Sequence, residues 1–422
     1  MKALSLFHAL SLSVVATLAQ AQAQTDFHLK SGDRVVFYGD SITDQRLYTT
    51  FAETFVVTRF PKLDVQFTHS GWGGDTVNGG GGGGIDTRLQ RDVFAYKPTV
   101  MTIMLGMNDG SYRAFEQRIF DTYSKGYEKI IAAVKQNVPG IRLTLIQPSP
   151  FDDVTQPPKF EGGYNAVLVR YGQFVKELAG RENLGVADLN TAVVAALEKA
   201  RATDADTAKK IIADRVHPGS AGQLLMAAEL LKAWHAPATV STVELDGAAR
   251  KLVKATGTKV SVKDGGTALA WMQEDTALPM PVDLSDAVMA LAVKSSDFVK
   301  SLIQQPLKVT GLTADRYTLK IDGSDVGVFT REQLAEGVNL AVLPTPMAKQ
   351  AADVHRLTLQ HNNLHFARWR SIQVPLANTK SARVQKALPE LLQGLDEDEA
   401  EVVKQQRAAA QPKTRNYELV PQ

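Results

Sequence analysis

The feature that most constrains the fold is an alternation across residues 33–234, where short apolar runs rich in β-forming residues exchange with amphipathic stretches of helical period. The run at 99–105, TVMTIML, is continuously apolar, which is typical of a strand buried on both faces. A chain that alternates in this way forms a parallel sheet covered by helices, so we expect an α/β domain of about 210 residues. The expected strands are 34–38, 64–68, 99–105 and 142–147, and the expected helices are 50–59 and 120–136.

The pattern changes after Pro237. Short runs that suit antiparallel strands appear together with longer helical stretches, and Asp322-Gly323 is a turn signal between two of these strands. We interpret residues 238–375 as an accessory region of small sheet and helices packed on the first domain, which occupies residues 24–237. The expected strands lie at 252–262, 307–309, 317–321 and 327–330, and the expected helices at 284–303 and 345–370.

The last segment, residues 376–422, contains the acidic run LDEDEAE at 395–401 and is rich in Gln and Ala. A charge run of this kind is typical of a solvated helix face. We therefore expect a helical, charged tail that is separate from the accessory region.

The N-terminus has the pattern of a secretory signal. Met1 and Lys2 are followed by an apolar stretch at 3–18 and by two overlapping small-x-small cleavage sites, at 19–21 and 21–23. A membrane anchor is the alternative, but about 16 apolar residues interrupted by Ser and His fall short of the roughly 20 that span a bilayer. We expect residues 1–23 to be a signal peptide and the mature protein to be periplasmic or secreted, without stable membrane insertion.

Composition limits the chemistry that the chain can perform. Its 422 residues carry 47 Lys and Arg against 45 Asp and Glu, and a net charge of +2 is too balanced for a protein whose main work is binding phosphates, so we expect no nucleic-acid partner. The absence of cysteine excludes thiolate nucleophiles, Cys-ligated zinc, iron–sulfur clusters and disulfides. Stability must then come from core burial, which suits a large exported bacterial chain.

Four segments with polar or glycine residues follow expected strands or precede a helix. Ligands of parallel α/β sheets bind at the carboxyl ends of strands, so Ser41 in the turn after the first strand is displayed where a nucleophile is useful. Asp and His three residues apart can meet around one turn, so that the carboxylate holds one imidazole nitrogen while the other faces a hydroxyl. The segments are Gly39-Asp40-Ser41, the glycine-rich 71–76, Gly106-Met107-Asn108-Asp109 and Asp214-Arg-Val-His217-Pro218.

Each segment alone also has an ordinary structural interpretation, as a turn, a helix cap or a surface pair. Gly79 to Gly84 is better read as a flexible loop beside the site than as a dinucleotide motif. His355, His361 and His365 give one i, i+4 pair, and we favour surface or interface histidines over a metal site. Taken together and in this order, however, the four segments are specific.

The four segments resemble the blocks of the SGNH, or GDSL, hydrolase superfamily over residues 33–235, about half of the chain. The resemblance implies a flavodoxin-like three-layer α/β/α fold, with Ser41 as nucleophile and His217 and Asp214 as its triad partners. It also implies an oxyanion hole made by the backbone N–H groups of Ser41 and Gly74 and the side-chain amide of Asn108. One departure is His69, which stands where the second block often has Asn.

The resemblance implies ester hydrolysis without a cofactor or metal. We expect an exported serine esterase acting on short-chain esters, most plausibly acetyl groups on a carbohydrate, with a small-molecule or polysaccharide ester as its partner. Trp72, Asp75 and Asp109 are candidate substrate-binding residues, with core packing as the alternative for Trp72. Two other functions stay open: a glycoside hydrolase on the same fold that uses paired carboxylates, and a non-catalytic glycan-binding module. The acyl group, the oligomeric state and the role of the accessory region stay undetermined.

Overall fold

The computed structural model describes residues 27–422, so the predicted signal peptide lies outside the described residues. Five parallel strands form the sheet of the first domain, in the order β2-β1-β5-β6-β7. Every residue of β5 is buried, as its continuous apolar sequence predicts for a strand covered on both faces. The strands are β1 (Asp33–Gly39), β2 (Val65–Gly71), β5 (Val100–Met104), β6 (Arg142–Ile146) and β7 (Gly185–Ala187).

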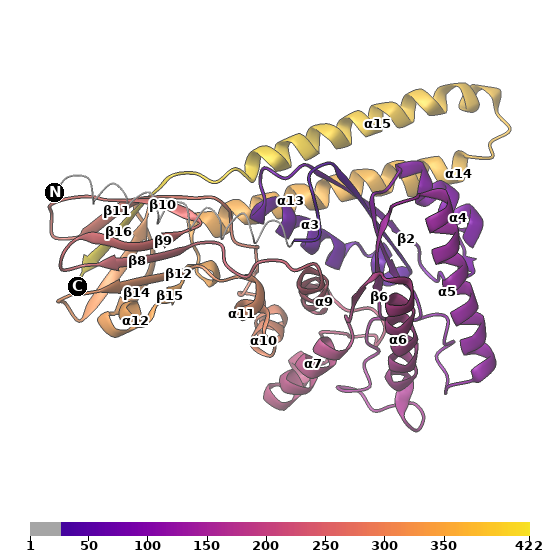
Figure 1. The fold of residues 1–422 in the computed structure, drawn as a ribbon, viewed down its shortest axis with the longest axis horizontal. Helices are drawn as coiled ribbons and strands as arrows, with labels where there is room; N and C mark the ends of the chain where they lie inside the picture. The colour runs from indigo at the N-terminus through magenta and orange to yellow at the C-terminus, as the bar shows by residue number, and fades with distance from the viewer. Residues whose placement is uncertain (1–26) are drawn as a thin grey trace.

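Helices lie on both faces of this sheet: α3 packs against α9, and α5 packs against α6 (Figure 1). In α5 the buried side chains Tyr123, Tyr127, Ile130 and Val134 recur at helical spacing and form the face that meets the sheet. This arrangement confirms the expected three-layer α/β/α fold. The helices are α2 (Ser41–Asp44), α3 (Leu47–Arg59), α4 (Ile85–Asp92), η1 (Phe94–Tyr96), α5 (Gln117–Asn137), α6 (Gly163–Glu182), α7 (Thr191–Thr203), α8 (Ala205–Ala208) and α9 (Ser220–Ala233).

The accessory region contains two sheets that share one apolar core. One has the order β10-β11-β16-β13-β14 and is antiparallel throughout, whereas the other, β15-β12-β8-β9, pairs β12 with β8 in parallel. That parallel pair differs from the expected all-antiparallel arrangement. The strands are β8 (Thr242–Asp246), β9 (Lys251–Thr256), β10 (Thr258–Val262), β11 (Leu269–Asp275), β12 (Pro306–Thr310), β13 (Arg316–Ile321), β14 (Ser324–Thr330), β15 (Val338–Asn339) and β16 (Arg415–Pro421).

The helix expected at 284–303 is two helices, because Ser295, Ser296 and Asp297 interrupt it. The other long helix, expected at 345–370, is confirmed as α13, which continues into the π-helix η3. Among residues 27–422, no helix is both long and apolar enough to cross a membrane. The helices are α10 (Ala287–Lys294), α11 (Phe298–Leu302), α12 (Arg331–Glu336), η2 (Leu340–Val342), α13 (Pro346–Phe366), η3 (Ala367–Gln373), α14 (Val374–Leu376) and α15 (Ala382–Ala409).

The end of the chain is not the separate helical tail that we expected. Residues 415–421 form β16, which lies in the middle of the antiparallel sheet between β11 and β13. The side chains of Tyr417 and Leu419 are fully buried, while Asn416 and Glu418 point outward, which is the period-2 pattern of a strand with one buried face. The accessory core is therefore completed by the last residues of the chain.

Helices α13 and α15 form a long antiparallel pair that extends from the accessory sheets across the first domain (Figure 1). Along this pair, α13 packs on α3 and β2. The acidic residues of the run in α15 are exposed, as expected, except for the half-buried Glu399. Asp396 pairs with Arg368, and Glu399 pairs with His361 and His365, so part of the run faces α13 and η3.

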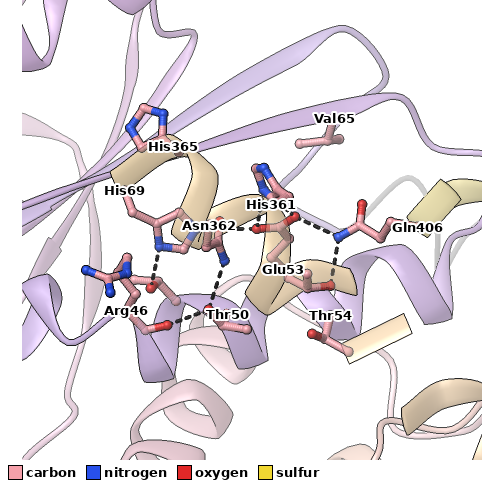
Figure 2. A network of polar contacts seen from close by, with 12 residues as sticks. Arg46, Thr50, Glu53, Thr54, Val65, His69, His361, Asn362, His365 and Gln406 are labelled. Atoms are coloured by element: carbon pink, nitrogen blue, oxygen red, sulfur yellow. Dashed lines mark hydrogen bonds and ion pairs between the residues drawn. The ribbon is translucent and has the colours of Figure 1, made fainter. Parts of the chain in front are cut away.

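Glu53 of α3 is the centre of a buried polar network between the first domain and this helix pair (Figure 2). His361 Nε2 lies 3.0 Å from Glu53 Oε1, and Gln406 Nε2 donates to the same oxygen at 2.9 Å. On the other side, His69 Nε2 lies 3.3 Å from Glu53 Oε2. The second nitrogen of His361 lies 3.1 Å from Glu399. The three histidines of α13 are thus interface residues, one of the two placements that we expected.

The network holds one imidazolium between two carboxylates. Burial works to lower the pKa of His361, but the carboxylates of Glu53 and Glu399 raise it to about 10. Burial also opposes ionisation of the carboxyls, yet the histidines hold the pKa of Glu53 well below its usual range and that of Glu399 at about 2. Burial lowers the pKa of His69 to about 4, so this ring is neutral at neutral pH.

We expect His361→Leu to lower the free energy of unfolding by about 3–5 kcal/mol, because Glu53 would stay buried without its cation. The contribution of His361 is complete below its unfolded pKa of about 6.5 and is lost as pH rises toward 10, whereas the two glutamates contribute above about pH 4.5. Urea unfolding near pH 6 therefore measures the full effect. The double variant Glu53→Gln/His361→Leu removes both charges and should lose less stability than His361→Leu alone; an equal or greater loss would contradict the account.

Candidate active site

The turn between β1 and α2 displays Ser41 at the carboxyl end of β1, the strand that lies between β2 and β5 in the sheet. Asp40 caps α2, because its side chain accepts a hydrogen bond from the Ile42 N–H at 3.0 Å. Gly39 is required here, since a Cβ at this position would lie 2.2 Å from the Thr43 hydroxyl and 2.7 Å from the Met104 carbonyl oxygen. A tight turn with a cap therefore fixes the direction of the Ser41 side chain.

The loop before α9 supplies an acid and a base to the same place. The carboxylate of Asp214 turns back on its own loop, where Oδ1 accepts from the backbone N–H groups of Val216 and His217 at 3.0 and 2.8 Å. Arg215, which directly follows Asp214, has a left-handed φ of 74° that closes the turn. The Asp-x-x-His spacing thus forms one compact loop, as the sequence predicted.

Ser41, His217 and Asp214 form one hydrogen-bonded chain. His217 Nε2 lies 2.8 Å from Ser41 Oγ, and His217 Nδ1 lies 2.7 Å from Asp214 Oδ2. Partial burial works to raise the pKa of Asp214, but the hydrogen bonds from His217 and Val216 hold it below its usual value. An ionised carboxylate only accepts, so Nδ1 donates to Asp214 and the Nε2 of the neutral ring accepts from Ser41. This is the arrangement that activates a serine nucleophile.

The loop after β2 brings backbone N–H groups to the same edge of the sheet. Gly74 has a φ of 78°, and a Cβ built on it would meet nothing within 4 Å, so this backbone faces open space. Within the described residues, its N–H group donates no hydrogen bond to another protein group. It is therefore free to donate to a ligand.

Asn108 follows β5, and its amide is held from two sides. One Nδ2 hydrogen is donated to the Asp75 carbonyl at 3.0 Å, and Oδ1 accepts from the Tyr112 hydroxyl at 2.9 Å. An amide nitrogen has two hydrogens, so a second N–H remains for a ligand. Tyr112, which we did not identify from the sequence, therefore orients this amide, and its own φ of 55° is a left-handed conformation unusual for Tyr.

Trp72 and Asp75 do not lie where we expected substrate contacts. Trp72 is 8% exposed, with Arg370 stacked over its ring and Trp369 packed edge-on against it. Asp75 is fully buried and forms a 2.7 Å ion pair with Arg88. Their prediction as substrate-binding residues is therefore wrong, and core packing, the alternative for Trp72, is confirmed.

Asp109 forms a structural hydrogen bond between two loops of the site. Its Oδ1 accepts from the Val77 N–H at 2.9 Å, which ties the β5 loop to the loop after β2. Burial raises the pKa of both Asp109 and Asp40 to about 7, and the neighbouring carboxyl of Asp75 adds to this effect in each case. Asp109 therefore fixes the loop that carries Asn108 against the loop after β2.

The glycine run at 79–84 forms a two-stranded hairpin, β3 (Gly79–Gly80) and β4 (Gly83–Gly84), beside the loop after β2. Gly82 lies directly on the Trp72 indole, because a Cβ there would come within 2.4 Å of the ring. The run therefore adds a packed hairpin against Trp72, in contrast to the flexible loop that we expected.

An open hollow of about 390 Å³ lies beside Ser41 and His217. Its other lining residues are Asp44, Gln45, Arg46 and Phe366. Phe366 comes from α13, some 320 residues away from the first block in the sequence, so no local pattern could have placed it here. Gln45 is bonded to Gln223 of α9, whose amide also donates to the Pro218 carbonyl next to His217.

With this geometry established, comparison with known proteins gives a consistent result. Residues 37–225 match the GDSL-like Lipase/Acylhydrolase family. These residues form a GDSL-like acylhydrolase domain. An acetylxylan esterase from Geobacillus stearothermophilus is 25% identical over 224 residues, which are 48% of this chain and 94% of that protein. The protein is therefore an ester hydrolase.

Two solved structures extend the comparison. One, described as a gut microbial diltiazem-metabolizing enzyme, is 25% identical, with a TM-score of 0.79 over 94% of this chain and 100% of that chain. The accessory region is thus shared with that enzyme as well as the GDSL-like domain. The other, an acetylxylan esterase from G. stearothermophilus, is 24% identical and covers 49% of this chain and 96% of its own, with a TM-score of 0.41.

The departure of this GDSL-like domain from the usual second block has a structural consequence. His69 Nδ1 lies 2.6 Å from the Thr49 hydroxyl, and its Nε2 faces Glu53, so the residue belongs to the buried network below the site. No group of three or more His, Asp or Glu side chains among residues 27–422 is arranged to hold a metal ion.

Proposed function

We propose that the GDSL-like domain hydrolyses short-chain esters, acetyl esters of carbohydrates above all, with Ser41, His217 and Asp214 as its triad. The observation that carries the proposal is the hydrogen-bonded chain from Ser41 Oγ through His217 to Asp214, at the carboxyl edge of the parallel sheet.

In the first half of the reaction, His217 Nε2 takes the proton of Ser41 as Oγ attacks the ester carbonyl carbon. Asp214 holds the ring in the tautomer that allows this and stabilises the imidazolium that forms. The carbonyl oxygen becomes negative, and the N–H groups of Gly74, Ser41 and Asn108 are the donors proposed to hold it. The imidazolium then gives its proton to the departing alcohol oxygen, which leaves an acyl group on Ser41.

In the second half, water takes the place of the alcohol. His217 removes a proton from the water, and the oxygen adds to the acyl carbon. Collapse of the second tetrahedral intermediate breaks the bond to Ser41 Oγ, which recovers its proton from His217. The products are a carboxylic acid and the free enzyme.

Two facts support an acetyl ester on a sugar. The curated relative is named an acetylxylan esterase, and the open hollow beside Ser41 combines the charged side chain of Arg46 with the ring of Phe366. A hydrogen-bond donor beside an aromatic ring can bind both the hydroxyl groups and the C–H face of a sugar.

No structural observation favours the two alternative functions, a glycoside hydrolase and a non-catalytic glycan-binding module. A glycoside hydrolase needs two carboxyls facing the substrate, whereas Asp44 is the one carboxyl among the described residues that line the hollow. Asp40 and Asp75 are buried, and Asp75 is paired with Arg88. A binding module would not need the serine–histidine hydrogen bond. Export remains a proposal from the sequence, because residues 1–23 lie outside the described part of the chain.

A substrate panel tests the function. We expect the protein to release acetate from acetylated xylan and to hydrolyse 4-nitrophenyl acetate faster than the octanoate, and the panel should include diltiazem, the compound named for the neighbour of full-length similarity. Unacetylated xylan is the control and should yield no reducing ends. Reducing ends from that control would favour the glycosidase, and xylan binding without any ester turnover would favour the binding module.

A further inference from the structure

One wall of the hollow beside Ser41 consists of Arg46 and Phe366, and so it contains a residue from outside the GDSL-like domain. The guanidinium of Arg46, at the end of the turn after α2, lies over the ring of Phe366 from α13 at 4.1 Å from the ring centroid. Both side chains are half-buried and line the same hollow as Ser41 and His217. The first domain and the accessory region therefore meet at the site itself.

The position of His217 decides which part of an ester reaches this wall. When the acyl-enzyme forms, the imidazolium must give its proton to the alcohol oxygen, so that oxygen lies within hydrogen-bond reach of His217 Nε2. Because His217 and Phe366 line one hollow, the alcohol part of the ester extends into it. The oxyanion donors Gly74 and Asn108 are not among the residues that line it.

The polar residues that line the hollow include a hydrogen-bond donor, Arg46, and an acceptor, Asp44. Arg46 uses Nη1 to donate to the Asp44 carbonyl at 2.8 Å, and within residues 27–422 no protein acceptor takes its Nε and Nη2 hydrogens. Asp44 Oδ1 is buried without a hydrogen-bond partner and lies 3.9 Å from Arg46 Nη1, with which it forms an ion pair. The hydroxyl groups of a sugar both donate and accept, and the C–H face of a sugar ring packs on an aromatic ring. An apolar lipid alcohol would offer no acceptor to the Nε and Nη2 hydrogens of Arg46.

Helix α13 also holds the backbone of Arg46 in place (Figure 2). Asn362 Nδ2 donates to the Thr50 hydroxyl at 2.9 Å, and that hydroxyl donates to the Arg46 carbonyl at 2.5 Å. Arg46 has a φ of 60°, a left-handed conformation that persists only where its surroundings hold it. One turn after Asn362, α13 reaches Phe366 and becomes the π-helix η3, an irregularity that is frequent at functional sites.

We propose that the accessory region completes the ester site, with Phe366 and Arg46 as specificity-determining residues that bind a sugar alcohol next to the scissile bond. The inference rests on the proposed function and adds to it the residues that select the alcohol. Because the wall contacts the alcohol and not the reacting carbonyl, it contributes to KM more than to kcat.

The test compares two substrates that share the acetyl group, 4-nitrophenyl acetate and partially acetylated xylo-oligosaccharides, in the full-length protein. For Phe366→Ala, the ratio of KM for the sugar ester to KM for the aryl ester should rise about tenfold. Arg46→Lys keeps the positive charge but removes the planar guanidinium with its several N–H donors, and it should raise the same KM ratio. Leu364→Ala, on the same helix and half-buried but outside the hollow, is the matched control and should leave the ratio unchanged.

The outcomes separate this proposal from the function on which it rests. Wild-type protein that hydrolyses neither ester contradicts the proposed function. Wild-type activity together with an unchanged KM ratio in Phe366→Ala would contradict the role of Phe366 in binding the alcohol but not the esterase function. An equal fall of kcat on both substrates would also contradict that role, because it indicates a structural effect of the substitution. If Phe366→Ala does not fold, Phe366→Leu keeps the apolar packing and removes only the ring, and it should still raise the ratio.

Discussion

Replacement of Ser41 by alanine should lower kcat for every ester by several orders of magnitude, to roughly 10⁻⁴–10⁻⁶ of the native value. Without Oγ no acyl-enzyme can form, and only binding and oxyanion stabilisation remain to assist water. His217→Ala should have an effect of similar size, and the double variant should be little worse than either single variant, because the triad acts as a unit.

Initial rates with 4-nitrophenyl acetate and with acetylated xylan measure this effect. Ser285→Ala is a suitable control, since this serine is exposed in the accessory region and bonds only to Asp283. Unchanged thermal unfolding of Ser41→Ala would show that the loss is chemical. Near-native turnover by Ser41→Ala would end the acyl-enzyme account.

Asp214→Asn should both slow the enzyme and move its pH profile. The imidazole must be neutral to accept the Ser41 proton, so kcat/KM should rise with pH along a limb for one proton. The pKa of Asp214 lies below its usual value, so this carboxylate stays ionised across that limb and does not cause it. A carboxylate beside an imidazole favours the imidazolium, so its loss should shift the limb to lower pH.

The same change can leave His217 in the wrong tautomer, and the plateau rate should fall to about 10⁻⁴ of the native value. The measurement is kcat/KM against pH for the native enzyme and Asp214→Asn on one substrate. Asp204→Asn is a matched control. The Asp204 carboxylate also accepts a hydrogen bond from a backbone N–H three residues later, that of Thr207, but it caps α8 and does not contact Ser41 or His217. A limb that stays in place after loss of Asp214 would contradict the assignment of His217 as general base.

The sequence was sufficient for the α/β domain and for the grouping of its polar residues. Strand β5 could be recognised because parallel strands covered on both faces are continuously apolar, and the four blocks follow strand ends or precede a helix. The resemblance of these blocks to the SGNH superfamily predicted that Ser41, His217 and Asp214 lie together, and they do. Local spacing indicated only that Asp214 and His217 could meet around one turn.

What the sequence did not reveal depends on contacts between distant segments. Phe366 and Glu399 gave no local signal, because their roles depend on the packing of α13 on α3 and of α15 on α13. Trp72 and Asp75 were misassigned because a glycine-rich block next to the site looks exposed, whereas Arg370 and Arg88 cover them in the fold. Strand β16 was hidden in a Gln- and Ala-rich ending, although the alternation of Tyr417 and Leu419 was present.

The central claim, that Ser41 forms the covalent intermediate, is tested most directly with a fluorophosphonate, whose phosphorus is attacked by an activated serine with loss of fluoride, which leaves a stable adduct on Oγ. Intact-mass and peptide mapping of the full-length protein should show one adduct, on the peptide that contains Ser41, with esterase activity lost in proportion to labelling. His217→Ala should remain unlabelled over the same period, because its serine is not activated. An adduct on a different residue, or full activity of the protein labelled at Ser41, would contradict the account.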